Sequence, residues 1–152
     1  PVAGWPIFIH VEYLHILISY MREDGEECFQ DGNYLELPML QRGLLWGIGR
    51  LCQEHRAEVL RHQVVDDVAL YLSSPDGQVV GLAVWCLSLL GGETALAKLS
   101  NFLEKPGHVQ IFLDYKLTNM PLAQLARNGF SLENLSGSDE RCLRQHSSLI
   151  LP

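Results

Sequence analysis

An internal repeat constrains the fold of this chain more than any other feature of its sequence. Residues 40–52 (LQRGLLWGIGRLC) align with residues 79–91 (VVGLAVWCLSLLG) at an offset of 39, and the alignment places Trp46 opposite Trp85. In both segments the apolar positions recur at the i, i+4, i+8, i+11 spacing of one helix face. We therefore expect two equivalent helices, and a period near 40 residues is typical of stacked helix pairs.

A second alignment extends the repeat toward the start of the chain. Residues 10–25 (HVEYLHILISYMREDG) align with residues 62–77 (HQVVDDVALYLSSPDG) at an offset of 52. Each segment is amphipathic and ends in Asp-Gly, a pair that stops a helix and turns the chain. The connection after the first helix should therefore be about 13 residues longer than its counterpart, and the extra length falls in residues 25–37 (GEECFQDGNYLEL).

Turn-forming residues divide the chain into its expected elements. Pro38 suits a first helical turn, whereas Gly-Gly at 91–92 and Pro-Gly at 106–107 end helices. The expected helices cover residues 6–21, 38–53, 56–72, 78–90 and 93–105. Beyond residue 107 two β-favouring runs predict a hairpin over 108–121, turning at Asp114-Tyr115, and a short helix over 122–127 that stops at Asn128-Gly129.

The predicted fold class is therefore mainly all-α. We expect about five stacked helices, with the C-terminal β-hairpin and short helix (108–130) as a cap, because a short stack must cover its outer faces. Residues 1–130 would form a single domain. Residues 131–152 would be either a mobile tail or a segment that docks through its apolar end, residues 149–151.

Composition narrows the function classes. A chain of 152 residues that is 47% hydrophobic can bury one sizeable core, and its net charge of −7 argues against nucleic-acid binding, since phosphates repel an acidic protein. The most apolar window, residues 78–92, is too short to cross a bilayer. The cysteines are scattered without a C-x-x-C pair, so we expect reduced thiols in a cytoplasmic protein. These cysteines are Cys28, Cys52, Cys86 and Cys142.

Residues 75–91 (PDGQVVGLAVWCLSLLG) resemble the first helix of HEAT-like repeats of the phycobilisome-lyase type. The shared pattern is Pro, an acidic turn, Val-x-x-x-Ala, and then small-Leu-small-x-Leu-Gly. The resemblance covers residues 6–105, about two and a half repeats without a third complete helix pair, and departs from the family at Val80, where Arg is common. It implies a stacked α-α fold but not a single function, because HEAT-like families include scaffolds, tetrapyrrole lyases, iron-dependent hydroxylases and a DNA glycosylase.

No residue set predicts catalysis, a cofactor or a metal. The chain has no His-Glu dipeptide, so the iron ligands of the hydroxylases cannot be carried over, and it has no G-x-S-x-G nucleophile motif. Cys52, His55 and His62 provide fewer ligands than the four of a closed zinc site. We therefore expect a protein that is not an enzyme and that has no cofactor.

Two groups of residues are candidates for partner binding. Trp46 lies off the apolar stripe of its helix, between Arg42 and Arg50 at i−4 and i+4, while Trp85 lies on a helix that is apolar all round. The indoles either pack under the cap or a loop, or anchor a partner, since Trp and Arg are enriched at binding hot spots.

The second group is acidic. Residues 1–40 contain seven acidic residues and one basic residue, so nearly all of the net charge lies there. The segment is either a solvated loop or a docking surface for a basic partner. Its candidate binding residues are Glu23, Asp24, Glu26, Glu27 and Asp31.

The leading functional hypothesis is a cytoplasmic, non-enzymatic protein-interaction or scaffold module that binds another protein and neither nucleic acid nor membrane. Two alternatives stay open. The first is a tetrapyrrole-lyase-type or enzyme-associated accessory domain. The second is a structural part of a homodimer, formed through Trp85 or the C-terminal tail, or of a larger assembly.

Overall fold

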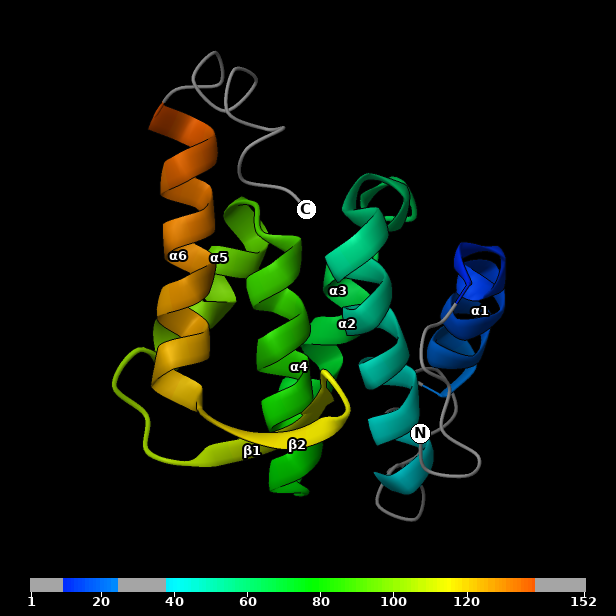
Figure 1. Ribbon diagram of the computed structural model, residues 1–152, viewed down its shortest axis with the longest axis horizontal. Coiled ribbons are helices and arrows are strands. Elements are labelled where there is room, and N and C mark those ends of the chain that lie inside the picture. The colour runs from blue at the N-terminus through cyan, green and yellow to red at the C-terminus, as the bar shows by residue number, and fades with distance from the viewer. Residues whose placement is uncertain (1–9, 25–37, 139–152) are drawn as a thin grey trace.

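The computed structural model describes residues 10–24 and 38–138, and the side chains of residues 10–22 and 38–132. The structure is mostly helical (74%), with six α-helices in the described ranges and a two-stranded antiparallel hairpin that precedes the last helix (Figure 1). The predicted fold class is confirmed. The predicted start of the first helix, residues 6–9, lies outside the described residues.

The described elements follow one another along the chain in this order. Helix α1 (Leu14–Asp24) is preceded by the 3₁₀ turn η1 (Val11–Tyr13), and α2 runs over Pro38–Arg61. Helix α3 (Val65–Ala69) continues as η4 (Leu70–Ser73) before α4 (Gly77–Leu90). Helix α5 (Glu93–Leu99) continues as η5 (Ser100–Phe102), and β1 (His108–Leu113), β2 (Lys116–Pro121) and α6 (Leu122–Ser138) complete the described chain.

The helices form three successive pairs. Helices α2, α4 and α6 run side by side in the same direction (Figure 1). Helix α1 packs on α2, α3 with η4 packs on α4, and α5 contacts both α4 and α6. The third pair, α5 and α6, is complete. The sequence predicted only its first helix as part of the stack, because the hairpin separates the two helices along the chain.

The first helix of each pair, taken with its N-cap and any 3₁₀ turn that continues it, buries three residues at the same i, i+4, i+7 spacing, which is one helix face. These triplets are Leu14, Ile18 and Met21; Val64, Val68 and Tyr71; and Ala95, Leu99 and Phe102. The first two triplets are offset by 50 residues. The alignment at 52 was therefore wrong by two positions, because it matched the Asp-Gly pairs that follow the helices instead of the buried faces.

The predicted helix over 56–72 is interrupted. His55 has non-helical angles (φ −136°, ψ 47°), so the turn expected there is a kink inside α2, and Gln63 takes a left-handed conformation (φ 54°) after α2 ends. In one continuous helix Val64 and Val68 would lie about 140° and 180° around the axis from Val59. All three are fully buried, and the break at Gln63 rotates the chain so that they reach one core.

The predicted end of the helix over 122–127 is also wrong. Helix α6 continues through Gly129 to Ser138. Gly129 is not a stop signal but a close contact. A β-carbon at this position would lie 2.6 Å from Leu99 Cδ1 and 3.2 Å from Ser88 Cα. The glycine therefore lets α6 approach α4 and α5, and the helix enters the range predicted as a tail.

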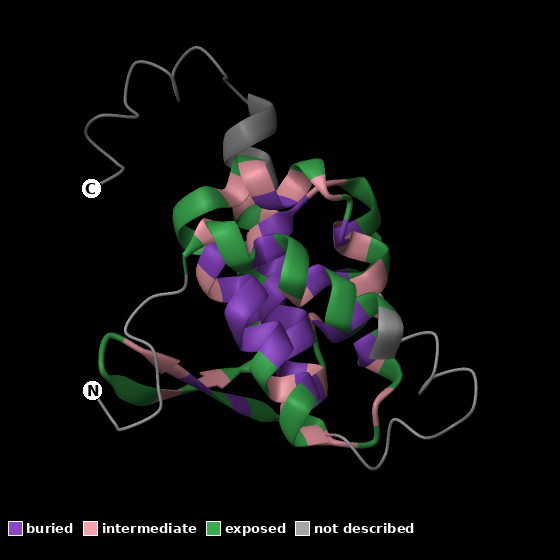
Figure 2. Ribbon diagram, turned by 90° about the vertical axis from the view of Figure 1, so that its right-hand side faces the viewer, coloured by how far each residue is buried: buried purple, intermediate pink, exposed green. Residues whose placement is uncertain are grey.

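The core centres on α4, which contains no charged residue and is buried along almost its whole length. Buried residues gather in the middle of the helical body, and exposed ones lie on its outside (Figure 2). The hairpin crosses the beginning of α4 rather than the end of the stack: Val109 packs on Gly81, where a β-carbon would lie 2.3 Å from the valine. It therefore covers the helices from the side.

Candidate interaction surfaces

Trp46 lies beneath the hairpin. Its side chain is 8% exposed, and its indole Nε1 donates a hydrogen bond of 3.0 Å to the backbone oxygen of Phe112 in β1. Burying an indole is favourable when its N–H keeps a partner, which the strand supplies here. Of the two interpretations of this residue, packing under the cap describes its place in the structure.

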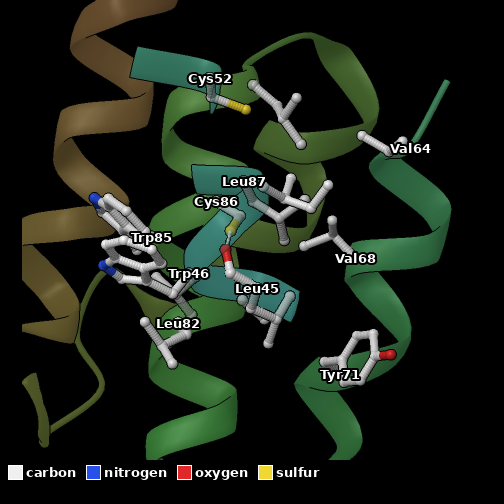
Figure 3. Packing of buried hydrophobic residues seen from close by; sticks show 14 of the residues in the cluster. Leu45, Trp46, Cys52, Val64, Val68, Tyr71, Leu82, Trp85, Cys86 and Leu87 are labelled. Atoms are coloured by element: carbon white, nitrogen blue, oxygen red, sulfur yellow. Dashed lines mark hydrogen bonds between the residues drawn. The ribbon is translucent and has the colours of Figure 1, made fainter. Parts of the chain in front are cut away.

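Trp85 is buried between helices. It is 3% exposed, and its six-membered ring covers Gly49 so closely that a β-carbon there would lie 2.1 Å from Cζ3. In Figure 3 the indoles of Trp46 and Trp85 project to the same side of α2 and α4, toward α6 (brown). Neither ring is available to a partner in this conformation.

Arg42 and Arg50 flank Trp46 on α2, and both have partners within the chain. Arg42 Nη2 donates to the Asp76 carboxylate, while Arg50 lies 3.6 Å from the Glu54 carboxylate and donates to Gln53. The predicted Arg-Trp-Arg face is therefore a face of intramolecular contacts, closed by the hairpin over its centre.

Asp76 links Arg42 to the start of α4. Its Oδ1 accepts a hydrogen bond of 2.9 Å from the Val79 N–H, which makes it the N-cap of the helix. Burial acts to raise the pKa of Asp76, but the hydrogen bonds from Arg42 and the helix N–H groups outweigh it and lower the pKa below its usual value. The carboxylate is therefore held in its charged form.

Arg56 holds the other end of α4. Its Nε donates to the Leu89 oxygen (3.0 Å) and its Nη2 to the Leu90 oxygen (2.7 Å), carbonyls that have no partner within the helix. A cation is favourable at a helix C-terminus. The kink at His55 precedes Arg56 directly, and α2 thus fixes both ends of the uncharged helix α4 through its arginines.

The acidic candidates are only partly within the described residues. Glu23 and Asp24 form the end of α1, and Glu26, Glu27 and Asp31 lie outside the described residues. Acidic residues in the last turn of a helix oppose its dipole, at a cost of about 0.3–1 kcal/mol each. The last turn of α1 thus has two acidic residues in its sequence beside the basic Arg22, whose guanidinium donates to the Asp67 carboxylate.

A surface that the sequence analysis missed lies on the outer side of α1. Tyr13, the last residue of η1, and Ile16 and Tyr20 of α1 are 56%, 40% and 56% exposed and follow the i, i+3, i+7 spacing of one helix face. They are centred about 130° around the axis from the buried triplet Leu14, Ile18 and Met21. Helix α1 is thus apolar over about 200° of its circumference, twice the stripe that burial against one neighbour needs.

The described cysteines, Cys52 and Cys86, are buried. Burial raises the pKa of Cys52 to about 12, which Arg56 offsets only in part, and burial raises the pKa of Cys86 well above its usual value. Cys86 Sγ donates a hydrogen bond of 3.0 Å to the Leu45 oxygen (Figure 3). Both residues are protonated near neutral pH and behave as small apolar side chains.

Within residues 10–22 and 38–132, no group of three or more His, Cys, Asp and Glu side chains is arranged to hold a metal ion. None of the helices in the described part of the chain combines the length and the apolar character that crossing a membrane requires. No protein-family model, curated protein or solved structure matches the chain, so the resemblance to HEAT-like repeats stays a prediction.

Proposed function

We propose that the protein is a non-enzymatic interaction module that binds a basic, amphipathic helix of another protein on the outer face of α1. The observation that carries the proposal is the exposed row formed by Tyr13, Ile16 and Tyr20. Tyrosine is enriched at binding hot spots because it buries a large apolar ring and keeps a polar group for hydrogen bonding.

The outer faces of the two terminal helices, α1 and α6, differ in polarity, and this difference supports α1 as the binding face. A stack of helix pairs stays soluble when its terminal helix has a polar outer face. Helix α6 follows this rule, because its exposed positions at i, i+3, i+4 and i+7 are Gln124, Arg127, Asn128 and Ser131. Helix α1 and the preceding turn η1, at the other end, expose two tyrosines and an isoleucine instead, which is typical of a face that another helix covers.

Charge supports a basic partner. Glu23 and Asp24 end α1, and the 40 residues that include this helix contain nearly all of the net negative charge of the chain. Complementary charge steers association and sets the orientation of a bound helix. A helix with an apolar stripe and lysine or arginine beside it matches both the apolar face of α1 and the net negative charge of residues 1–40.

The proposal can be tested with two synthetic amphipathic peptides that share the same leucine positions and differ only in a lysine or glutamate polar face. Fluorescence anisotropy should show at least tenfold tighter binding of the lysine peptide, weakening as salt is raised. Ile16→Ser should weaken this binding several-fold. Leu70→Ser is the matched control, because Leu70 is similarly exposed (45% against 40%) but lies on η4, and it should leave binding unchanged.

Equal affinity for the two peptides, or equal effects of Ile16→Ser and Leu70→Ser, would contradict the proposal. The triple variant Tyr13→Ser/Ile16→Ser/Tyr20→Ser should abolish binding and keep the melting temperature of the parent protein. A large loss of stability in this variant would show that the chain itself covers the face, and would also contradict the proposal.

A further inference from the structure

The two strands of the hairpin differ in what their outer edges contact. A two-residue turn, Asp114-Tyr115, joins them, and the register pairs Leu113 with Lys116, Phe112 with Leu117 and Gln110 with Asn119. In such a hairpin the pair next to the turn is hydrogen-bonded and the pairs then alternate. Phe112 and Gln110 on β1, and Leu117 and Asn119 on β2, therefore direct their backbone groups away from the hairpin.

The outward groups of β1 are satisfied by the helices. The Phe112 oxygen accepts from Trp46 Nε1, the Gln110 N–H donates to Gln78 Oε1 at 3.1 Å, and the Gln110 oxygen accepts from Gln78 Nε2. These contacts agree with the alternation and occupy the β1 edge. A further strand cannot be added on this side.

The outward groups of β2 are open. Among the described residues, no hydrogen bond reaches the backbone N–H or oxygen of Leu117 or Asn119, and both residues are exposed, Leu117 to 63%. The open edge is short. The turn bounds it at one end, and at the other Pro121 has no N–H and the chain enters α6.

We propose that a second copy of this chain adds to β2 in antiparallel orientation, about a two-fold axis at Thr118, to form a four-stranded sheet. Leu117 of each copy then lies opposite Asn119 of the other, and the two pairs exchange four N–H···O bonds. Every outward group on these residues is used. An unpaired strand edge is the usual template for such an addition.

The ends of β2 select this register. Sliding the second copy by two residues in one direction places Pro121 opposite Leu117. Pro121 has no N–H, and its oxygen already accepts the first hydrogen bond of α6, so this pair exchanges no bonds. Sliding it in the other direction places Tyr115, a turn residue with φ 67°, opposite Asn119. Each shift loses hydrogen bonds that the register centred on Thr118 retains.

Side chains favour the same pairing. Leu117 and Phe112 form a cross-strand pair on the solvent face of the hairpin, and the two-fold axis brings Leu117 of both copies to diagonal positions, where apolar side chains touch. Lys116 of each copy lies opposite Met120 of the other, so no like charges face each other. The β2 sequence is thus complementary to itself in this register, since it supplies the four backbone bonds, the leucine contact and a pairing free of like charges, which is why the second copy is the favoured occupant.

Sedimentation equilibrium up to about 1 mM protein tests the proposal, since an interface this small gives weak association. Asn119→Pro removes an outward N–H without touching the β1–β2 ladder, and it should weaken dimerisation at least tenfold. Asn119→Thr keeps the N–H and should dimerise like the parent. Unchanged tryptophan fluorescence in both variants, to which Trp46 contributes with Trp5 and Trp85, would show that the hairpin is retained.

Disulfide formation tests the register, in a background in which Cys28 and Cys142 are replaced by Ser. Thr118→Cys should form a disulfide-linked dimer, because two residues facing across the axis have α-carbons about 4.5 Å apart. Lys116→Cys, on the same strand and face but away from the axis, should not. A protein that stays monomeric, an Asn119→Pro variant that dimerises like the parent, or equal cross-linking of the two cysteine variants would overturn the proposal.

Discussion

Two alanine substitutions on one helix give the sharpest test of how α2 and α4 pack. Gly43 and Gly49 both lie inside α2, but a β-carbon at Gly43 would meet no atom within 4 Å, whereas one at Gly49 would lie 2.1, 2.5 and 2.6 Å from three ring atoms of Trp85. The same substitution should therefore have opposite effects at the two positions.

The magnitudes follow from helix propensity and from the overlap. Alanine in place of a helical glycine stabilises by about 1 kcal/mol, which is the expected gain for Gly43→Ala. At Gly49 the ring or the helix must move by about 1.3 Å to restore van der Waals contact, and overpacking of this kind costs about 3 kcal/mol. Gly49→Ala should thus destabilise by about 2 kcal/mol. In a chain of this size these values correspond to about +3 °C and −6 °C in Tm.

Urea and thermal unfolding followed by circular dichroism would measure both effects. Trp85→Leu in the Gly49→Ala background removes the rigid ring, and the double-mutant cycle should then show a coupling of at least 1 kcal/mol. Effects of the same sign at Gly43 and Gly49, or purely additive effects of the pair, would refute the contact between Gly49 and the indole.

Three further predictions concern groups that hold the elements together. Asp76→Asn keeps the cap oxygen but removes the charge, so the variant should have a lower free energy of unfolding than the parent at neutral pH. Because folding lowers the pKa of Asp76, this difference should be constant above about pH 5 and should shrink as the pH falls through the folded pKa. Arg56→Ala should destabilise the fold by about 2–3 kcal/mol, because it leaves two helix-end carbonyls without their donor. Arg61→Ala is the control: it removes only an exposed ion pair with Glu58 and should change stability by less than about 0.5 kcal/mol. Tyr115→Gly should stabilise by about 1 kcal/mol in urea unfolding, since glycine adopts the positive φ of the turn without strain, and a loss of stability would contradict the turn geometry.

The sequence predicts the second helices of the pairs better than the first ones. The offset of 39 residues correctly equates α2 with α4, because both bury the same positions: Leu44, Ile48 and Leu51 correspond to Ala83, Leu87 and Leu90. The first helices are shorter and α3 passes into a 3₁₀ turn, so their apolar spacing is too brief to set a register. The alignment of the first helices therefore depended on the Asp-Gly pairs, which mark where helices end and not which face is buried.

Glycine caused the main error in the C-terminal part, and neighbouring residues explain why. Gly91 and Gly92 were correctly predicted as a break, and both have positive φ (69° and 91°). Gly129 follows Asn128 and looks like a similar stop signal, but it lies inside a helix. It is a glycine because Leu99 and Ser88 leave no room for a side chain. Local sequence cannot distinguish a glycine needed for its backbone angles from one needed for its size, since the second requirement is set by a different helix.

The candidate surfaces were hidden from sequence for a related reason. Trp46 has the composition of a binding site around it, but its indole is satisfied by a strand 66 residues further along the chain, and that contact depends on a hairpin register that no local pattern specifies. Conversely, Tyr13, Ile16 and Tyr20 look like half of an ordinary amphipathic helix until the opposite face is seen to be buried. A helix face becomes a candidate site only when the structure shows which face the core already uses.

The exposed face of α1 and the open edge of β2 have a common origin in how the helix pairs are stacked. Each pair buries the faces of its neighbours, so the first helix of the first pair is left with an apolar outer face that nothing in the described chain covers. The hairpin interrupts the third pair and closes over Trp46 on its β1 side, which necessarily leaves β2 as an unpaired edge. One surface would recognise side chains of a helix and the other the backbone of a strand. They can therefore be occupied at the same time, and a dimer through β2 would present two α1 faces to basic partners.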